Sequence, residues 1–240
     1  MKIIQNYVNS VLSGRQDIWD HFRNEKICIC TSQRAFLRPP EDVCANIAVG
    51  ENVSFDVVIL AIAEQKRQIR LNFRLNEFSQ LRCLILAEGC EELNVTIFVE
   101  LDGEHSSSEV KNFFIGENFD KQVFSLSQVH NAKSAVSNTI SKVVLDDSSI
   151  AEFHGNITIA EAATNSDANQ RSDSILLSGE AKATSCPNLN IQNNAVKCSH
   201  GATVGTIDRS AVFYMMSRGV DEQSCKRLIM EGELAAIINS

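Results

Sequence analysis

Proline and glycine are scarce in this sequence, with 3 Pro and 11 Gly among 240 residues. Loop-rich folds need more of these turn residues, so we expect many turns to be formed by Asn, Asp and Ser, which tolerate left-handed backbone angles. Lys and Arg (22) are outnumbered by Asp and Glu (30), giving a formal net charge of −8. This charge disfavours the phosphate attraction on which nucleic-acid-binding proteins depend, so we expect no nucleic-acid partner.

Several motifs of defined chemistry are also missing. No run of about 18 uncharged apolar residues occurs, so we expect no membrane span. No Cys-x-x-Cys pair occurs, which disfavours a zinc ribbon or a thioredoxin-type redox site. The sequence lacks a Gly-x-x-x-x-Gly-Lys-Ser/Thr loop, a Gly-x-Gly-x-x-Gly loop and a Gly-x-Ser-x-Gly nucleophile elbow. We therefore expect no nucleotide bound by this chain and no independent enzyme.

The chain has eight cysteines, but no signal-peptide-like apolar region precedes them. Asp17 and Asp20 also disfavour an organelle transit peptide, because such peptides are poor in acidic residues. Reduced thiols and a cytoplasmic location are therefore expected. Most of the cysteines are predicted to pack in the core, as Cys83 does in an apolar run and Cys225 on an apolar helix face. Cys28 and Cys30 share one face of an extended segment, which leaves a weaker hypothesis of metal or persulfide binding.

The first segment, residues 1–28, is predicted to be helical. Apolar residues at 4–12 and 18–22 have the three-to-four spacing of amphipathic helices, with an interruption near Gly14. This pattern predicts two short helices, with Trp19 as a packing anchor for the second.

Residues 29–206 have the period of two that is typical of strands with one buried face. Apolar and other residues alternate strictly at 69–75 and 93–101, and a looser apolar run covers 81–87. The three starts are twelve residues apart, and no helical segment of useful length separates the later strands. Further short strands are predicted at 122–126, 141–145, 150–153, 157–160, 174–178 and 189–192.

Many short strands joined by polar corners are compatible with a sandwich, a barrel or a β-solenoid. The hairpin dipeptides Asn-Gly and Asp-Gly occur once, at Asp102-Gly103, and this favours parallel coils over hairpins. Regular hexapeptide and Gly-rich nonapeptide repeats are absent, so among solenoids an irregular coil is favoured, while a sandwich or a barrel stays open at this point. The predicted corner residues are Asn76, Asn94, Asn131, Asn138, Asp146, Asp147, Asn156, Asn165, Asn188, Asn193 and Asn194.

Residues 207–240 are predicted to form a C-terminal helical segment. Asp208 is a candidate N-cap, and Gly219 lies where a left-handed C-terminal residue is expected. The apolar stripe of this helix consists of Val212, Phe213 and Met216, which we expect to bury it on the β body. Asp221 is predicted to cap a second helix, with a face formed by Cys225, Leu228 and Ile229.

Four segments after residue 150 carry specific motifs. They are Phe-His-Gly-Asn-Ile at 153–157, Asn-Gln-Arg-Ser-Asp-Ser-Ile-Leu-Leu at 169–177, Val-Lys-Cys-Ser-His-Gly-Ala-Thr-Val-Gly at 196–205 and Phe-Tyr-Met-Met-Ser-Arg-Gly at 213–219. This set resembles the SufB/SufD components of the SUF iron-sulfur assembly machinery. The resemblance implies a mainly β fold with a right-handed parallel β-helix core and a C-terminal helical domain.

The branch is indicated by the residues around the motif histidine. SufB-like chains carry Glu on both sides of that histidine and a Cys in the Gln-x-Cys-Asp-Ser region. This chain has Ser199 and Gly201 beside His200, and Ser172 at the cysteine-like position. It therefore resembles the SufD branch, although it is short for the family.

The resemblance also implies partners and a cofactor. In a SufBCD complex, a SufC-like ABC ATPase docks on the C-terminal helices, and a paired SufB/SufD core holds a transient iron-sulfur cluster or iron at the subunit interface. Predicted ATPase-docking residues are Phe213, Tyr214, Met215, Arg218 and Gly219. Candidate residues of the paralogue or dimer interface are Ser199, Gly201 and Thr203.

Cys198 and His200 are the candidate metal ligands. In an extended strand they share a face at roughly 7 Å Cα spacing, and thiolate and imidazole both bind iron. The structural alternative is that Cys198 is a small core hydrophobe and His200 a hydrogen-bonded core or interface residue.

Three functions remain open from the sequence. The first is a SufD-like scaffold subunit, not an enzyme, that pairs with a SufB-like chain and binds the ATPase, which hydrolyses ATP. The second is a homodimeric minimal scaffold, and the third is a cluster-free structural β-solenoid adaptor.

Overall fold

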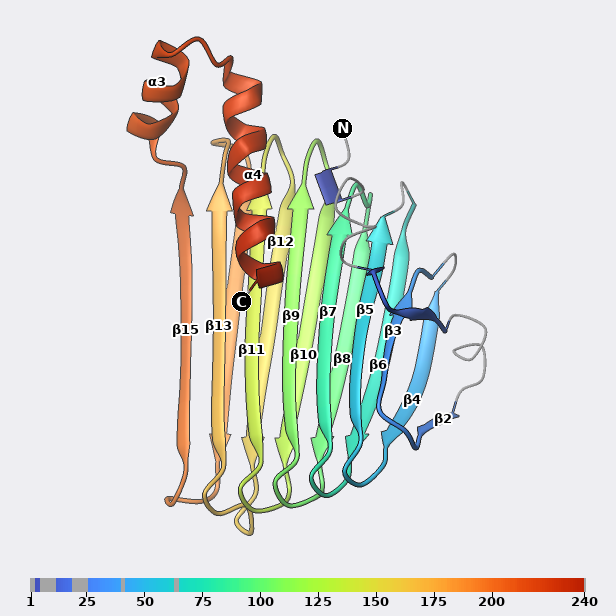
Figure 1. The fold of residues 1–240 in the computed structure, drawn as a ribbon. Helices are drawn as coiled ribbons and strands as arrows, with labels where there is room; N and C mark the ends of the chain where they lie inside the picture. The colour runs from blue at the N-terminus through green and yellow to red at the C-terminus, as the bar shows by residue number, and fades with distance from the viewer. Residues whose placement is uncertain (1–2, 5–11, 19–25, 40–41, 63–64, 240) are drawn as a thin grey trace.

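A computed structural model of the chain describes residues 3–4, 12–18, 26–39, 42–62 and 65–239 (Figure 1). Within these residues the chain is mainly β, and two helices follow the last strand. The helices are α3 (Arg209–Ser217) and α4 (Glu222–Asn239). None of the helices in the described part of the chain is long and apolar enough to cross a membrane.

The strands form two sheets, and every pairing within them is parallel. One sheet contains β1 (Gln16–Asp17), β3 (Gln33–Leu37), β5 (Ser54–Ile62), β7 (Gln80–Glu88), β9 (Ser107–Gly116), β11 (Val136–Leu145), β13 (Asp167–Leu176) and β15 (Lys197–Thr206). The other contains β2 (Lys26–Ile29), β4 (Val43–Val49), β6 (Arg67–Leu75), β8 (Leu93–Leu101), β10 (Lys121–His130), β12 (Ile150–Ile159) and β14 (Lys182–Ile191). Successive strands alternate between the sheets, so the prediction of a parallel β-solenoid is confirmed.

One coil of the solenoid contains two strands. Arg67 of β6 lies opposite Leu93 of β8, which is one coil of 26 residues (93 − 67), and Lys121 of β10 lies opposite Ile150 of β12, a coil of 29 (150 − 121). The twelve-residue spacing in the sequence is therefore about half a coil. The strands predicted at 69, 81 and 93 are confirmed as β6, β7 and β8.

The main core fills the space between the two sheets. Residues of one parity along each strand point inward and stack on their partners in the next coil, as Leu71, Ile97 and Leu126 do. In the first coils these inward residues are apolar, and Phe55 and Phe73 lie with ring centroids 6.5 Å apart. Such stacks exclude water along the whole coil, which supplies the main hydrophobic stabilisation.

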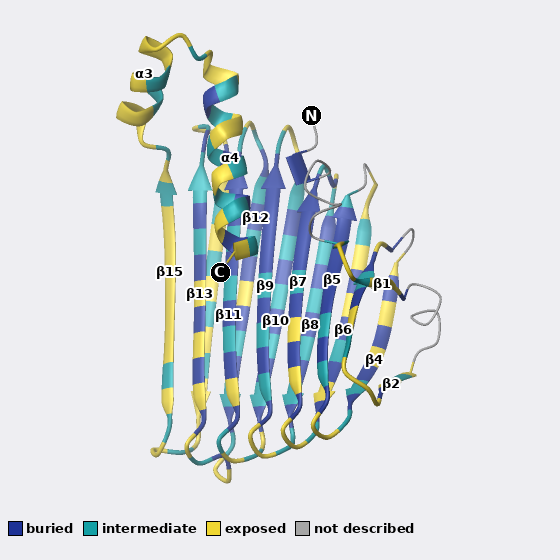
Figure 2. Ribbon diagram, in the orientation of Figure 1, coloured by how far each residue is buried: buried dark blue, intermediate teal, exposed yellow. Residues whose placement is uncertain are grey.

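A second core lies on the outer face of the odd-numbered sheet. There α4 packs along the strands β9 and β11, and Figure 2 shows many residues of these strands coloured as buried. Leu234 and Ile237 of α4 are buried in one cluster with Phe113 and Val144 of the sheet. The N-terminal residues Ile3 and Ile4 belong to the same cluster, and the carboxylate of buried Glu88 accepts hydrogen bonds from both their backbone N–H groups.

Left-handed residues form columns at the corners between strands. One column is Asn52, Phe78, His105, Ser134 and Asn165, each with φ between 53° and 59°. Backbone N–H groups in this column donate to the next coil, for example from Asn165 to Ala195 O. The corner predictions are therefore confirmed at Asp147 and Asn165, which have positive φ.

Other predicted corners are wrong, because these asparagines lie inside strands: Asn94, Asn138, Asn156 and Asn188. Their side chains face outward, where asparagines of neighbouring coils bond to each other. Asn169 Nδ2, for example, donates to Asn138 Oδ1 at 3.1 Å. In a parallel solenoid, outward Asn side chains can therefore form hydrogen bonds between coils, in addition to the role of Asn in turns.

The N-terminal prediction is partly wrong. Ile3, Ile4 and Leu12 are helical, and residues 16–17 form a short strand, β1, which pairs with β3 and was not predicted. The predicted second helix, apart from Ile18, lies outside the described residues. Trp19 lies outside the described residues.

The caps of the C-terminal helices are confirmed. Asp208 Oδ1 accepts from Ser210 N at 2.8 Å, Asp221 Oδ1 accepts from Ser224 N at 2.9 Å, and Gly219 has a φ of +92°. The predicted burial is wrong in two places. No residue of α3 is buried, because this helix lies past the carboxyl-terminal tip of β15 (Figure 1). On α4, Cys225 is buried as predicted, but Leu228 is 51% exposed, and Met230, Leu234 and Ile237 supply the rest of the buried face.

Candidate functional site

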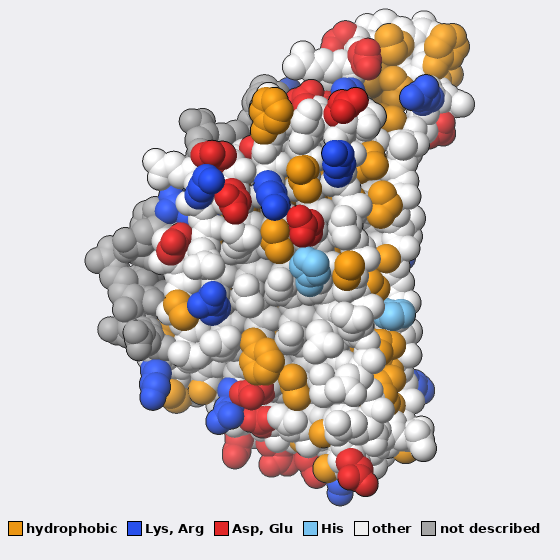
Figure 3. Space-filling model, turned by 180° about the vertical axis from the view of Figure 1, so that it is seen from behind, with side chains coloured by type: hydrophobic (Ala, Val, Ile, Leu, Met, Phe, Trp, Pro, Cys, Tyr) orange, Lys and Arg blue, Asp and Glu red, His pale blue; other side chains and the backbone are white. Residues whose placement is uncertain are grey.

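The candidate site lies at the end of the solenoid that carries the last coil. β14 ends one sheet and β15 ends the other, and no further strand of the described chain covers them. Ile191 is 43% exposed and Val204 is 49% exposed, although both occupy inward positions. Viewed from behind, hydrophobic side chains follow this edge of the molecule (Figure 3). The last coil is thus an open end with unpaired strand edges.

Cys198 and His200 lie on β15 at inward positions. Their partners on β13, Ala168 and Gln170, are both buried, so the predicted shared face is confirmed. Cys198 is half-buried and packs against the apolar cluster that includes Ala168, whereas His200 is exposed. The structure therefore places a thiol and an imidazole side by side at the open end.

Burial raises the pKa of the Cys198 thiol, and the nearby charge of Asp167 raises it further. The thiol is protonated in this environment, so a metal would have to displace a proton in order to bind. Nowhere in the described part of the chain do three His, Cys, Asp or Glu side chains gather closely enough to hold a metal ion. Cys198 and His200 can supply two ligands, and any others must come from sulfide or another chain.

Ser199, Gly201 and Thr203 alternate with these residues and therefore face outward. Ser199 Oγ donates to Asn169 Oδ1 at 2.8 Å, which continues the ladder of outward asparagines. All three residues are exposed on the terminal strand. Their place in a paralogue or dimer interface remains a prediction.

A groove of about 450 Å³ runs beside them between the odd-numbered sheet, the start of α3 and α4. Its walls include Ile175 and Ile229, and two ion pairs border it. Lys142 Nζ contacts Glu233, and Arg171 Nε lies 2.7 Å from Asp173 Oδ2.

The predicted docking residues of α3 are exposed together. Phe213 is 74% exposed, and the Arg218 guanidinium lies over the Tyr214 ring, 5.4 Å from its centroid. Met215 is half-buried, and Gly219 follows the helix with its left-handed backbone. Phe213, Tyr214 and Arg218 are therefore accessible to a partner, and Met215 is accessible in part.

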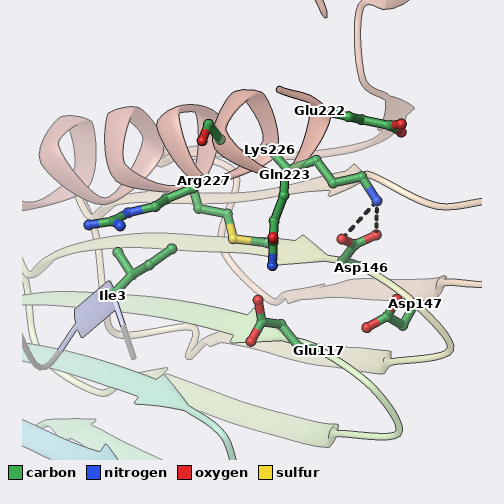
Figure 4. Close-up of a pocket in the computed structure, with 10 residues that line it drawn as sticks. Ile3, Glu117, Asp146, Asp147, Glu222, Gln223, Lys226 and Arg227 are labelled. Atoms are coloured by element: carbon green, nitrogen blue, oxygen red, sulfur yellow. Dashed lines mark hydrogen bonds and ion pairs between the residues drawn. The ribbon is translucent and has the colours of Figure 1, made fainter. Parts of the chain in front are cut away.

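A cleft of about 660 Å³ between α4 and the rim of the solenoid was not predicted (Figure 4). Glu117, Asp146 and Asp147 come from the corners of the solenoid, and Lys226 reaches from α4 to the carboxylate of Asp146. Pairing through one end of the solenoid is an expectation of the family resemblance, but the exposure of inward apolar residues such as Ile191 and Val204 at that end was not predicted.

This architecture defines a class of protein. An all-parallel β-solenoid with an uncovered last coil and an exposed helix, α3, offers extended surfaces to other chains. A family model, the SufBD core domain of the SUF system of iron-sulfur cluster assembly, matches residues 43–233. The chain belongs to this family of assembly scaffold components.

Individual relatives agree with the SufD-like assignment. The chain is 36% identical to the iron-sulfur cluster assembly protein SufD of Escherichia coli over 101 residues, which are 42% of this chain and 24% of that protein. It is 29% identical to SufD of Bacillus subtilis over 139 residues, 58% of this chain and 32% of that protein. A SufBD family protein of Synechocystis is 30% identical over 109 residues, 45% of this chain and 24% of the relative. These matches span a quarter to a third of the length of each relative.

Proposed function

We propose that this chain is a SufD-like scaffold subunit that pairs with a SufB-like chain through its open end and binds a SufC-like ABC ATPase through its C-terminal helices. The observation that carries the proposal is the uncovered last coil, which exposes apolar inward residues and presents His200 and Cys198. We also place the protein in the cytoplasm, since four of its cysteines (Cys28, Cys30, Cys44 and Cys186) are exposed free thiols.

The open end suits pairing with another solenoid. Exposed strand edges carry unpaired backbone N–H and C=O groups, which are templates for another chain unless they are covered. Ile191 and Val204 add apolar area that pairing would remove from water. A second copy of this chain could occupy the same surface, which is the homodimeric alternative.

The ATPase-docking surface consists of Phe213, Tyr214, Met215, Arg218 and Gly219. Tyr, Phe, Met and Arg are enriched in protein interfaces, and here they lie on or directly after α3, a helix with no fully buried residue. ATP hydrolysis is assigned to the partner, and this chain is not an enzyme.

Pairing at the open end is tested by co-purification with the SufB-like and SufC-like chains of the same organism. The double variant Ile191→Lys/Val204→Lys should lose the SufB-like chain, because two charges would be buried without partners. Phe119→Lys is the matched control, since Phe119 is 82% exposed at the corner between β9 and β10, outside the last coil. Light scattering of the chain alone distinguishes pairing with a SufB-like chain from homodimerisation. A stable homodimer that Ile191→Lys/Val204→Lys dissociates would show that the partner at the open end is a second copy of this chain.

Cluster ligation is tested by anaerobic reconstitution of the complex with iron and sulfide. We expect a visible chromophore that His200→Ala abolishes or strongly weakens, while His154→Ala, at another exposed histidine, leaves it unchanged. Cys198→Ala reports whether the thiol contributes. A complex that forms no chromophore would support the cluster-free adaptor instead.

Docking of the ATPase is tested separately. Tyr214→Ala/Arg218→Ala should reduce capture of the SufC-like chain at least tenfold, since Tyr and Arg are common interface hot spots and truncation of one hot spot costs about 2 kcal/mol or more. Wild-type capture by this variant would contradict the assignment of α3, with Phe119→Ala as the control.

A further inference from the structure

The interior of the solenoid changes from apolar to partly polar along its length. After residue 106 many inward residues are polar, and most of their side chains form hydrogen bonds with each other across the interior. Gln128 Nε2 donates to Ser108 Oγ at 2.9 Å, and Thr139 Oγ1 donates to Gln128 Oε1 at 2.8 Å. Asn112 likewise bonds to Gln122 and Ser141. The deeper polar groups thus satisfy one another.

Gln170 breaks this pattern. Its side chain is inward and only 1% exposed, yet neither Nε2 nor Oε1 has a hydrogen-bond partner. Five buried side-chain N or O atoms lack a hydrogen-bond partner in the described chain, and three of them belong to Gln170 and Ser185. Gln170 lies on β13, directly beneath the terminal strand β15, and Ser185 lies on the terminal strand β14. Buried polar groups normally have partners, so these atoms point to something that is added at the open end.

The Gln170 amide is held in a confined place. It lies against Gly155 of β12, where an added Cβ would be 2.1 Å from Gln170 Nε2. Toward the deeper coil its partner in the column is Thr139, whose hydroxyl already donates to Gln128. Toward the open end its partner in the column is His200. Adjacent strands are about 4.8 Å apart, so the imidazole of an inward-turned His200 is within reach of the Gln170 amide.

We propose that Gln170 is the positioning residue of His200: when a partner chain covers the open end, the Gln170 carbonyl accepts the N–H of the inward-turned His200 ring. This inference rests on the proposed function of His200 as a ligand. In the uncovered chain His200 is exposed to water and needs no such contact. When a partner excludes this water, the Gln170 side-chain carbonyl becomes the neighbouring group that can accept a hydrogen bond from the His200 ring N–H.

The hydrogen bond has a defined chemical consequence. A neutral imidazole carries one proton, and a carbonyl that accepts it fixes the tautomer, so the other nitrogen is left as a lone-pair donor. That nitrogen then faces the interface, where iron would be held. Gly155 is part of this arrangement, because only a residue without a side chain leaves space for the Gln170 amide.

The test uses the metal-free complex of this chain with its SufB-like partner, with histidine labelled with ¹⁵N. We expect one tautomer of His200 in the wild-type protein and in Gln170→Glu, which keeps an acceptor, and a tautomer mixture in Gln170→Met. Gly155→Ala, which displaces the amide without changing it, should give the same mixture. Ser172→Ala is the control, since Ser172 is buried two residues away on the same strand beneath Ala202.

Binding of ferrous iron alone, measured anaerobically by titration calorimetry, gives the second readout. Gln170→Met should weaken it about tenfold, as loss of an outer-shell partner does elsewhere. An unchanged His200 tautomer and iron affinity in Gln170→Met would overturn the role of Gln170. If His200→Ala itself leaves iron binding intact, the proposed ligand role fails instead, whatever the tautomer. Should Gln170→Met not fold, Gly155→Ala and Gln170→Glu still decide between these outcomes.

Discussion

Lys226 and Asp146 connect the last helix to the rim of the solenoid: Lys226 Nζ lies 2.7 Å from Asp146 Oδ1 and 2.9 Å from Oδ2 (Figure 4). Both side chains are largely buried, and the two residues are 80 positions apart in the chain. The pair therefore fixes α4 on the sheet that ends in β15, and α4 in turn carries α3.

Lys226→Met should destabilise the docking of α4. Loss of a largely buried ion pair leaves the Asp146 carboxylate without its cation, and we expect a loss of about 1–2 kcal/mol in the free energy of unfolding. Hydrogen exchange of α4 amides should accelerate more than that of the strands. Lys182→Met is the control, because Lys182 is exposed and lies on β14 of the other sheet. Equal effects of the two substitutions would show that the Lys226–Asp146 pair does not hold α4.

His130 should make the stability of the solenoid dependent on pH. It is fully buried, its Nε2 lies 2.8 Å from Ser137 Oγ, and burial lowers its pKa to about 4. In the unfolded chain it titrates near 6.5, so the unfolded state binds the extra proton between pH 6.5 and 4. The stability is complete above pH 6.5 and falls as the pH drops through this window, by about 3 kcal/mol.

The measurement is the urea midpoint at pH 7.5 and pH 5. His130→Leu, which fits between Leu101 and Ile159 in the same column, should remove most of the difference between the two pH values. His154→Gln, at an exposed position, should leave the difference as it is in the wild-type protein. A His130→Leu variant with the wild-type pH dependence would assign the effect to other groups.

The strands were predictable where inward residues are apolar. The strict alternation at 69–75 and 93–101 predicts β6 and β8 closely, because hydrophobic stacking is what orders these coils. After residue 106 the predicted strands are shorter than the observed ones, for example 122–126 against β10 (Lys121–His130). Inward Gln122 and Gln128 break the apolar pattern, and only the folded coil shows that other inward side chains satisfy them.

The candidate site was predictable in its residues but not in its setting. Strand spacing placed Cys198 and His200 on one face, and the register confirms this. The stripe of Val212, Phe213 and Met216 predicted that α3 packs on the solenoid, whereas α3 lies past the carboxyl-terminal tip of β15 and none of its residues is buried. An amphipathic pattern shows that a face is apolar but does not show whether the chain itself or a partner covers it.

Asp147 should stabilise its corner in two ways. It has a φ of +51°, and its Oδ2 accepts from Asn118 N at 3.0 Å in the preceding coil. Asp147→Ala removes the acceptor and leaves a side chain that tolerates this backbone poorly, so we expect a loss of about 1–2 kcal/mol in the free energy of unfolding. Asp147→Gly loses only the hydrogen bond and should cost less, as denaturant unfolding will show. If Asp147→Gly is less stable than Asp147→Ala, the left-handed backbone at position 147 does not determine which residues are tolerated there.

Gly103 belongs to the one hairpin dipeptide of the sequence, yet it lies at a coil corner between β8 and β9, against the backbone of the preceding coil. A Cβ at this position would lie 2.0 Å from Glu77 N and 2.1 Å from Asn76 C. Backbone atoms cannot move aside as a flexible side chain can, so Gly103→Ala should push two coils apart and cost roughly 3 kcal/mol. Gly179→Ala is the matched control, since nothing lies within 4 Å of its added Cβ, and it should change the thermal midpoint very little. If Gly103→Ala is as stable as Gly179→Ala, the backbone of neighbouring coils can shift at the corners at little cost, and close stacking of the corners does not hold the coils in register.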